Sequence, residues 1–457
     1  MNQRPVDPET IERLREREQA AFFERNTASH ALFERALVVL PGGVPSGVCA
    51  LDPYPLAVDH GEGAYVWSLD GDRYVDYHNG FGTTVFGHGH PLLSAVVADR
   101  YKRGSHFGAM TEDACAWAEH LCERFGFDWV RGSASGTEAT MDAIRLARAA
   151  TKRTRVAKIE GGYHGTHEIA LVSNNLPLDR ALQGPDSAPR PRFASEGLSP
   201  RLADEVVVLP FNNLEADERA LAAGNVACLI IEPILMNVGT IWPKPGYLEG
   251  LRELCTRHGT FLIFDETKTG VTIAYAGAEE LFGVHPDITT LGKGIGGGIQ
   301  CGAVGSANRW LGGLIEDWKV PLLGTFSGNP LMAATGNAAL RHILTREAYV
   351  GLNRHYETLA ALLRGTIEQY ELPAYVTGVG AKGCVVWTAG EPLVDYRDYR
   401  DRFQFKLGGL AWLYLANRGV FLAPGQDEQW THGICHSDTE ALLFAQAFAE
   451  FAAELRA

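Results

Sequence analysis

Short runs of apolar residues alternate with stretches of helical periodicity through the middle of the chain. The runs Val226–Ile231 and 261–264 have the length of strands and are apolar at every position, as expected for strands buried on both faces. Between them, Tyr247–His258 repeats its apolar residues at helical spacing. This alternation is typical of parallel strands joined by helices. It predicts an α/β large domain built on a mostly parallel sheet.

Helical patterns dominate both ends of the chain. Asp7 before Pro8 is a helix-start signal, so we expect a helix over 8–25 and a second over 28–40. Residues 61–82 read as a hairpin, because apolar residues alternate on both sides of the turn Asp70-Gly71-Asp72. Four long helical patterns near the C-terminus surround short strands, at 332–344, 349–369, 402–417 and 439–455. They predict a smaller α+β domain.

The chain of 457 residues is longer than one typical domain of about 100–200 residues, so we expect two domains. Residues 1–75 would form the N-terminal helices and hairpin of the small domain, 76–335 the large domain, and 336–457 the rest of the small domain. The periodic pattern fails over 172–206, where five prolines occur. A loop of this length is either an active-site lid or a surface excursion, and both readings stay open.

Charge and cysteine usage narrow the class of protein. The chain has 41 Lys and Arg against 55 Asp and Glu, and this net charge of −14 argues against nucleic acid or an anionic membrane as partner. The eight cysteines include no CxxC pair, which weighs against a zinc module or a disulfide framework. The N-terminus is charged and no segment approaches 18 apolar residues. We therefore expect a cytoplasmic enzyme.

One pair of residues points to a particular cofactor. Asp265 closes a buried strand, and Lys293 lies 28 residues later in a glycine-rich turn. A pyridinium nitrogen needs a carboxylate partner to stay protonated, and an aldehyde needs a lysine amine to form a Schiff base, so pyridoxal 5'-phosphate (PLP) requires this pair. Taken alone, the spacing is a weak signal, because a capping Asp and a solvent-facing Lys produce it more often.

A phosphate site and several further polar residues accompany this pair. Ser135, Gly136 and Thr137 open a strong helical segment and can present N–H groups and hydroxyls to an oxyanion, although a common helix cap has the same pattern. Four other candidates follow strands or lie in a tight turn: Tyr163, Glu232, Asn237 and Thr325. Each of these alone is more often a core or turn residue.

Six motifs occur together in one order. They are SGTEA (135–139), YHG (163–165), IIEP with Asn237 five residues beyond Glu232, DETKTG (265–270), LGKGIGGG (291–298) and GTFSGNP (324–330). On these motifs the chain resembles the class III PLP-dependent aminotransferases, in particular their glutamate-1-semialdehyde aminomutase-like branch. Further matches, from PGGVPSG (41–47) to VFLAPGQDE (420–428), extend the resemblance over nearly the whole chain. It implies the PLP-dependent transferase fold of type I, with a seven-stranded sheet.

The resemblance also implies a role for each matched residue. Lys293 would hold PLP as an internal aldimine and would then move the proton between the substrate and the cofactor. The overall reaction would pass through a pyridoxamine phosphate intermediate. Asp265 would pair with the ring nitrogen. The other implied cofactor residues are Ser135, Gly136, Thr137, Tyr163, Glu232, Asn237, Thr267 and Thr325. A homodimer is implied, in which Thr325 reaches the neighbouring site. The implied substrate-binding positions are Cys49, Phe81, Tyr163 and Glu428.

The departures from the aminomutase pattern fall mainly on the substrate side. Cys49 stands where that branch has an Arg for the substrate carboxylate, and a neutral thiol cannot replace a bidentate guanidinium. Phe81 replaces a Trp, and Thr267 replaces a branched apolar residue; Ala134, Lys268 and Thr272 also differ. We therefore expect an aminotransferase acting between an amine or amino acid and a carbonyl acceptor. Its substrate could be a β-amino acid, an amine or an amino-sugar precursor.

Other functions remain as alternatives. A glutamate-1-semialdehyde-type aminomutase, or a PLP-dependent racemase or epimerase, would use the same lysine and carboxylate. The histidines of GHGHP (87–91) and YHGTHE (163–168) lack the HExxH spacing of a metal hydrolase, so no metal is expected. A binding protein on the same fold is also conceivable. Lys293 and Asp265 argue against it.

Overall fold

The computed structural model describes residues 3–174, 179–423 and 430–457, which form two compact units. Unit 1 comprises Met1–His90, Val350–Pro392 and Arg402–Ala457, and unit 2 comprises Pro91–Tyr349 and Leu393–Asp401. Unit 2 contains Lys293 and Asp265.

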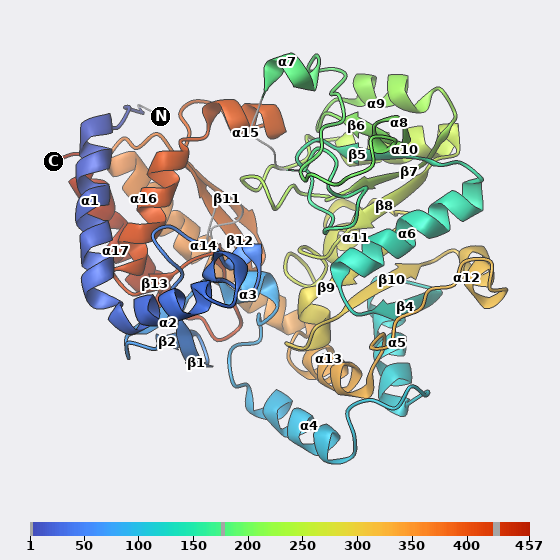
Figure 1. Cartoon of the computed structure of the whole chain (residues 1–457), viewed down its shortest axis with the longest axis horizontal. Coiled ribbons are helices and arrows are strands. Elements are labelled where there is room, and N and C mark those ends of the chain that lie inside the picture. The colour runs from blue at the N-terminus through green and yellow to red at the C-terminus, as the bar shows by residue number, and fades with distance from the viewer. Residues whose placement is uncertain (1–2, 175–178, 424–429) are drawn as a thin grey trace. The chain divides into compact units, whose positions relative to one another are not determined.

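Unit 2 is built on a seven-stranded sheet in the order β4-β10-β9-β8-β7-β5-β6 (Figure 1). The strands are β4 (Trp129–Ser133), β5 (Arg155–Ile159), β6 (Val206–Leu209), β7 (Val226–Ile231), β8 (Phe261–Asp265), β9 (Ile288–Gly292) and β10 (Gly302–Ser306). Neighbours from β9 to β6 pair in parallel, and β10 pairs antiparallel with both β9 and β4. The sequence prediction of a mostly parallel sheet is confirmed.

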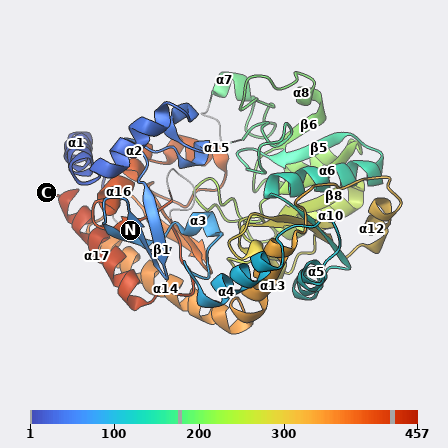
Figure 2. The ribbon, with the colours of Figure 1, turned by 60° about the horizontal axis from the view of Figure 1, so that its bottom comes forward.

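Helices cover this sheet because its strands are apolar on both faces. Ile230 and Ile263 pack in one core cluster with Ala143 and Ile144 of α6 (Gly136–Thr151), while Leu229 and Leu262, which point to the other face, are fully buried as well. The remaining helices of unit 2 are α4 (Pro91–Lys102), α5 (Glu112–Phe125), α7 (Arg180–Gln183), α8 (Leu202–Glu205), α9 (Leu214–Leu221), α10 (Tyr247–His258), α11 (Gly277–Phe282), α12 (Arg309–Glu316), α13 (Pro330–His342) and α15 (Tyr396–Arg402). Helix α13 packs against both α4 and α5 (Figure 2).

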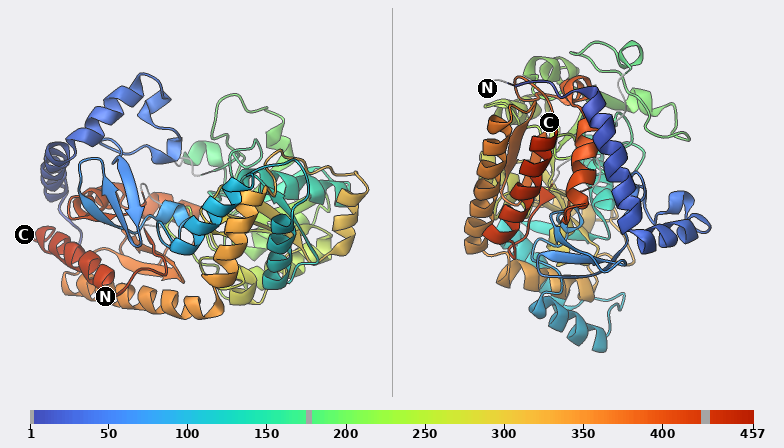
Figure 3. Two further views of the ribbon diagram at one scale, coloured as in Figure 1. Left: turned by 90° about the horizontal axis from the view of Figure 1, so that it is seen from below. Right: turned by 90° about the vertical axis from the view of Figure 1, so that its left-hand side faces the viewer.

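Unit 1 combines two small sheets with helices from both ends of the chain (Figure 3). Its sheets are β1-β2-β3-β13 and β11-β12-β14, and its helix α1 packs along α16. The strands are β1 (Val58–Glu62), β2 (Tyr65–Ser68), β3 (Arg73–Asp76), β11 (Tyr375–Val379), β12 (Lys382–Val386), β13 (Val420–Phe421) and β14 (Trp430–Thr431). The helices are α1 (Pro8–Arg25), α2 (Thr27–Leu37), α3 (Asn79–Gly82), α14 (Arg346–Gln369, which begins in unit 2), α16 (Phe405–Ala416) and α17 (Asp438–Glu454).

Helix α1 has the bounds that the sequence predicts. Its start is fixed by Asp7, whose carboxylate accepts a hydrogen bond from the Glu9 N–H at 3.3 Å, and by Pro8 in the first position. The hairpin expected over 61–82 is shorter than predicted. The Asp76 carboxylate accepts the N–H groups of His78 and Asn79, and this turn ends the strand. Residues 79–82 then all take positive φ, from 44° to 94°. Of the described helices, none is both long and apolar enough to cross a membrane.

Candidate active site

Lys293 and Asp265 end neighbouring strands of the unit 2 sheet. Asp265 is the last residue of β8 and pairs in register with Thr290 of β9. Lys293 begins the short 3-10 turn Lys293–Gly296 directly after β9, and its backbone is left-handed, with φ 54°. Parallel strands bring their carboxyl ends to one edge of a sheet, where ligands of such folds bind. The predicted pair therefore shares one edge, and Lys293 is half-buried there.

The Asp265 carboxylate is buried and well supplied with donors. Oδ1 accepts hydrogen bonds from the Thr267 N–H at 3.1 Å, the Thr267 hydroxyl at 2.6 Å and the Thr290 hydroxyl at 3.0 Å. Oδ2 lies 2.9 Å from His164 Nδ1. Burial alone would raise the pKa of Asp265, but His164 and Thr267 outweigh it and hold the pKa below its ordinary value. The group is thus an anion at neutral pH.

His164 fixes the second oxygen of this carboxylate. Its side chain is buried, and burial lowers its pKa, so the ring is neutral and Nδ1–H donates to Asp265. Its Nε2 atom has no hydrogen-bond partner within the part of the chain that the structure describes. The sequence reasoning did not assign His164 to this role. Its place directly after Tyr163 in YHG was the available signal.

The first turn of α6 faces the same edge of the sheet. Ser135 caps the helix, with its hydroxyl accepting the Glu138 N–H at 3.2 Å, and the next two N–H groups have no intrahelical acceptor. Gly136 packs so closely that a Cβ there would lie 2.8 Å from Thr267 Cγ2. Gly165 (φ 95°) is packed equally tightly on Thr137. This glycine-lined helix start suits an oxyanion.

Glu232 holds the turn that carries Tyr163. Its carboxylate accepts the Tyr163 N–H at 2.8 Å, the Met236 N–H at 3.1 Å and the Asn237 amide at 2.7 Å. Burial raises the pKa of Glu232 to about 7, although these donors and the nearby Lys268 oppose that shift. Glu232 and Asn237 therefore lie together, as predicted from the two residue positions, with Tyr163 attached through its backbone.

A buried lysine behind this turn was not anticipated. Lys158 of β5 is fully buried, and its ammonium donates to the carbonyl oxygens of Gly162, Ala170 and Val172 at 3.0, 3.2 and 2.6 Å. Burial lowers its pKa to about 7, against the raising effect of the Glu232 and Glu160 carboxylates. Lys158 thus ties both ends of the segment 162–172 to the sheet. A charged residue within the apolar strand RVAKI was the signal in the sequence.

The other residues singled out in the sequence lie in different parts of the chain. Lys268, the second lysine near the site, is buried close to Tyr163 and Glu232; burial raises the pKa of both residues, and the Lys268 charge opposes that rise. Thr325 is exposed in a turn of unit 2. Phe81 and Cys49 belong to unit 1, where Phe81 is half-buried and Cys49 is exposed. Glu428 lies outside the described residues.

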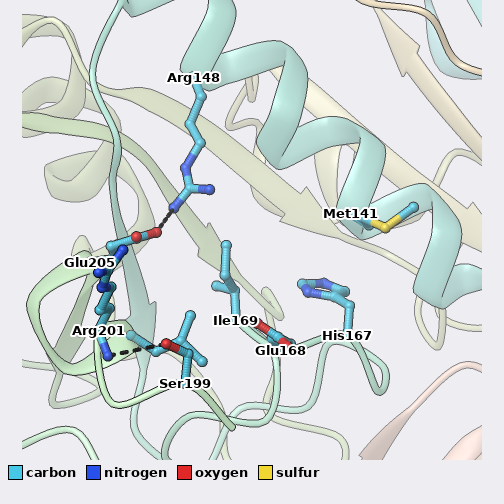
Figure 4. Close-up of a pocket in the computed structure, with 9 residues that line it drawn as sticks. Met141, Arg148, His167, Glu168, Ile169, Ser199, Arg201 and Glu205 are labelled. Atoms are coloured by element: carbon cyan, nitrogen blue, oxygen red, sulfur yellow. Dashed lines mark hydrogen bonds and ion pairs between the residues drawn. The ribbon is translucent and has the colours of Figure 1, made fainter.

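A cavity of about 400 Å³ in unit 2 lies beside α6 and α8 rather than at these residues (Figure 4). It is lined by Met141, Arg148, His167, Glu168, Ile169, Ser199, Arg201, Leu202 and Glu205. Arg148 pairs with Glu205 at 2.9 Å, and His167 lies 3.2 Å from the Thr140 hydroxyl. Its two most enclosed polar groups are thus satisfied within the protein, so we assign no ligand to it.

The residues at the sheet edge fit PLP. Asp265 offers an anionic oxygen for a ring nitrogen, because Oδ2 has His164 as its one donor among the described residues. The first turn of α6 offers N–H donors for a phosphate. Lys293 offers an amine at the end of the adjoining strand. The donor set therefore matches each of the three polar parts of that cofactor.

Comparison with known proteins agrees with this site. Residues 49–391 match the family model of class III aminotransferases. The glutamate-1-semialdehyde 2,1-aminomutase of Methanothermobacter thermautotrophicus is 38% identical over 406 residues, which cover 88% of this chain and 93% of that protein. The similarity thus extends over most of both chains.

Solved structures give the same result. The glutamate-1-semialdehyde aminomutase of Pseudomonas aeruginosa PAO1 superposes with a TM-score of 0.90 at 29% identity, covering 98% of this chain and 99% of that one. The same enzyme has been solved in complex with PMP. An omega-transaminase from Sphaerobacter thermophilus gives a TM-score of 0.89 at 32% identity, covering 96% and 100%.

The chain therefore belongs to the class III aminotransferases. It is a PLP-dependent enzyme of fold type I whose relatives are named both as aminomutases and as transaminases.

Proposed function

We propose that this enzyme is an aminotransferase that moves an amino group from an amine or amino acid to a carbonyl acceptor. The observation that carries the proposal is the contrast between the two sides of the site. The cofactor side keeps Lys293, Asp265 and the start of α6, as the family motifs have them, whereas position 49 has an exposed thiol in place of the guanidinium of the aminomutase pattern.

Each residue of the cofactor side has one task in this proposal. When bound, PLP supplies an electrophilic aldehyde and an electron-withdrawing ring. Lys293 would provide the amine that holds it, and the same amine would serve as the base and acid that moves a proton from the substrate carbon. Asp265 keeps the ring nitrogen protonated. Ser135, Gly136 and Thr137 bind the phosphate at the start of α6.

The residues around Tyr163 would orient the ring. Glu232 fixes the backbone of Tyr163, and Asn237 bonds to the same carboxylate, so the three would move as one group. Phe81, Cys49 and Glu428 remain the proposed substrate-side residues, because they occupy the positions at which the resemblance implies contact with the substrate.

The alternative is a glutamate-1-semialdehyde-type aminomutase, and the names of the curated relatives favour it. An aminomutase keeps the amino group within one molecule and needs no separate acceptor. Cys49 weighs against it, since the substrate carboxylate would lose its bidentate partner. A racemase or epimerase would use the same lysine without releasing an aminated cofactor.

The proposal includes a homodimer in which Thr325 completes the neighbouring site. Thr325 is exposed beside Leu323 and Phe326, which are 75% and 59% exposed, and Phe326 stacks on His106 at 4.8 Å. Phe107 and Met110, which follow His106 in the sequence, are also exposed, at 51% and 85%. A patch of this kind is typical of an interface, and a second copy would cover it together with Thr325.

The test is the absorption spectrum of the purified holoenzyme before and after adding a panel of amino donors. An aminotransferase will lose its visible band in favour of the near-ultraviolet band of the aminated cofactor, and the donors that act will define the substrate class. Conversion of glutamate-1-semialdehyde to 5-aminolevulinate without added acceptor would instead establish the aminomutase. A visible band that no donor converts, with loss of optical activity in one amino acid, would establish a racemase.

A further inference from the structure

The two oxygens of the Asp265 carboxylate are occupied very unequally. Oδ1 accepts three donors, namely the Thr267 N–H at 3.1 Å, the Thr267 hydroxyl at 2.6 Å and the Thr290 hydroxyl at 3.0 Å. Among the described residues, Oδ2 has one donor, His164 Nδ1 at 2.9 Å. A carboxylate oxygen has two lone pairs, so Oδ1 is saturated and Oδ2 has room for one more donor.

Neither hydroxyl is free to turn away. Thr290 is fully buried, and its position is fixed by the register of β9 against Asp265. The Thr267 methyl group is held by two glycines, since a Cβ on Gly136 or Gly292 would lie 2.8 or 3.1 Å from Thr267 Cγ2. With the methyl group packed there, the hydroxyl points to Asp265. The pair is therefore a fixed part of the carboxylate's surroundings.

We propose that Thr267 and Thr290 act as a hydroxyl pair that saturates Oδ1, directs the ring nitrogen of the cofactor to Oδ2, and weakens the hold of Asp265 on the proton of that nitrogen. Thr267 is in this role a positioning residue that acts through Asp265. The inference rests on the proposed function, because it needs Asp265 to be the partner of the ring nitrogen.

The physical reason lies in how a carboxylate shares its charge. Each hydroxyl that donates to the anion stabilises it and makes it a weaker acceptor for any further proton. The direction of the Asp265 pKa, held low by His164 and Thr267 against burial, agrees with this. The class III pattern has a branched apolar residue at position 267, which cannot donate. This chain should consequently hold its ring proton less tightly than a relative with that residue.

The test compares Thr267→Val with the wild-type holoenzyme, both loaded with PLP labelled with ¹⁵N in the ring. The substitution keeps the shape and removes the shortest bond to Oδ1. We expect the solid-state ¹⁵N resonance to move toward the value of a protonated ring nitrogen. We also expect PLP to dissociate about three- to tenfold more slowly, because the Asp265 carboxylate keeps more negative charge and Oδ2 binds the ring N–H more strongly. Thr290→Val should shift the resonance in the same direction.

Two controls separate this effect from a change in packing. Thr267→Ser keeps the hydroxyl and loses the methyl group, and should give the wild-type resonance. Thr256→Val removes an exposed hydroxyl on α10 and should change neither readout. An unchanged resonance in Thr267→Val, or a shift toward the unprotonated value with faster release of PLP, would overturn the inference.

Asp265→Asn in the same experiment tells this failure from a failure of the proposed function. If Asp265→Asn leaves the ring nitrogen protonated, Asp265 is not its partner and the proposed assignment of the site is wrong. If Asp265→Asn removes the proton while Thr267→Val changes nothing, Asp265 keeps its role and only the hydroxyl pair is wrong.

Discussion

Two lysines, Lys293 and Lys268, follow the ends of the neighbouring strands β9 and β8, and only one can hold the cofactor. Lys293 occupies a left-handed turn and is half-buried, whereas Lys268 is buried near Tyr163 and Glu232. We expect Lys293→Ala to lose covalent attachment of PLP and at least about a thousandfold in turnover, since no other amine ends β9.

Borohydride reduction followed by peptide mass spectrometry checks this prediction. The wild-type adduct should map to the peptide of Lys293, and Lys268→Ala should retain it. An adduct that survives in Lys293→Ala and maps to Lys268 would show that the lysines were assigned the wrong way round.

At the residue scale, the sequence supports part of the site. Asp265 could be placed at the sheet edge because it closes an apolar run that had to be a buried strand, whereas Lys293 was associated with it through its glycine-rich turn and the requirements of PLP. The hydroxyl of Thr290 could not be assigned to Asp265, because the register of β8 against β9 is a property of tertiary packing. Lys158 was missed for a similar reason, since its three acceptors come from a segment without periodic pattern.

At the scale of elements, the contact between the 163–165 turn and α6 depends on a glycine. Gly165 has φ 95°, and a Cβ there would lie 2.8 Å from Thr137 Cα. Gly165→Ala must therefore move the turn or the start of α6, and we expect weaker PLP binding by about tenfold or more, beyond a backbone strain of about 1 kcal/mol.

Equilibrium binding of PLP measures the effect, and Gly126→Ala serves as the matched control. Gly126 also has positive φ, at 68°, but a Cβ there meets nothing within 4 Å. The control should lose a similar amount of stability while binding PLP normally. Equal PLP affinity in the two variants would mean that the close packing of Gly165 has no role in the cofactor site.

Helices and strands could be predicted from the sequence where one local signal, such as a helix cap or a run of apolar residues, was strong. Helix α1 follows from its Asp-Pro start, and β7 from six consecutive apolar residues. The turn at 79–82 was not foreseen, because the Asp76 side chain, rather than any change in hydropathy, ends the strand before it. The segment 172–206 contains α7 and α8 among its described residues, yet neither helix has enough apolar periodicity to be recognised.

At the scale of the whole molecule, unit 1 contains a group of buried histidines that should make it sensitive to acid. His355 and His432 lie 4.4 Å apart, ring to ring, with His436 at 5.6 Å from His355. Burial lowers the pKa of His355 and of His436 to about 4 and that of His432 well below 6.5. Asp76 and Glu440 oppose this at His436, and Lys382 adds to it at His432.

The sign of the pH effect follows from these shifts. An unfolded histidine binds a proton below about pH 6.5, and the folded one only near pH 4, so the unfolded state is favoured as the pH falls between these values. We expect each such histidine to lower the free energy of unfolding by about 3 kcal/mol as the pH falls through that range. Urea unfolding from pH 7.5 to pH 4.5 measures it. The slope of the free energy of unfolding against pH gives the number of protons taken up on unfolding, and His355→Phe should reduce that number by about one. An unchanged slope would show that His355 does not contribute to the acid sensitivity.

A second prediction at this scale concerns oligomerisation. The double substitution Leu323→Glu and Phe326→Glu puts two charges on the exposed patch beside Thr325, so we expect dissociation to a monomer and loss of PLP affinity. Sedimentation velocity measures the first effect. Leu442→Glu, at a position that is 57% exposed on α17, is the control and should stay dimeric. A double variant that remains dimeric would place the interface elsewhere.

The left-handed backbone of Lys293 has a consequence for anyone who redesigns this chain. In residues other than glycine, the left-handed conformation costs about 1 kcal/mol of stability. Glycine at position 293 would therefore give the more stable protein, but it would also remove the amine. Optimisation for thermostability alone would therefore select against the amine to which we assign the cofactor. Screens of this enzyme by melting temperature need to hold Lys293 constant, because here the fold and the chemistry favour different residues.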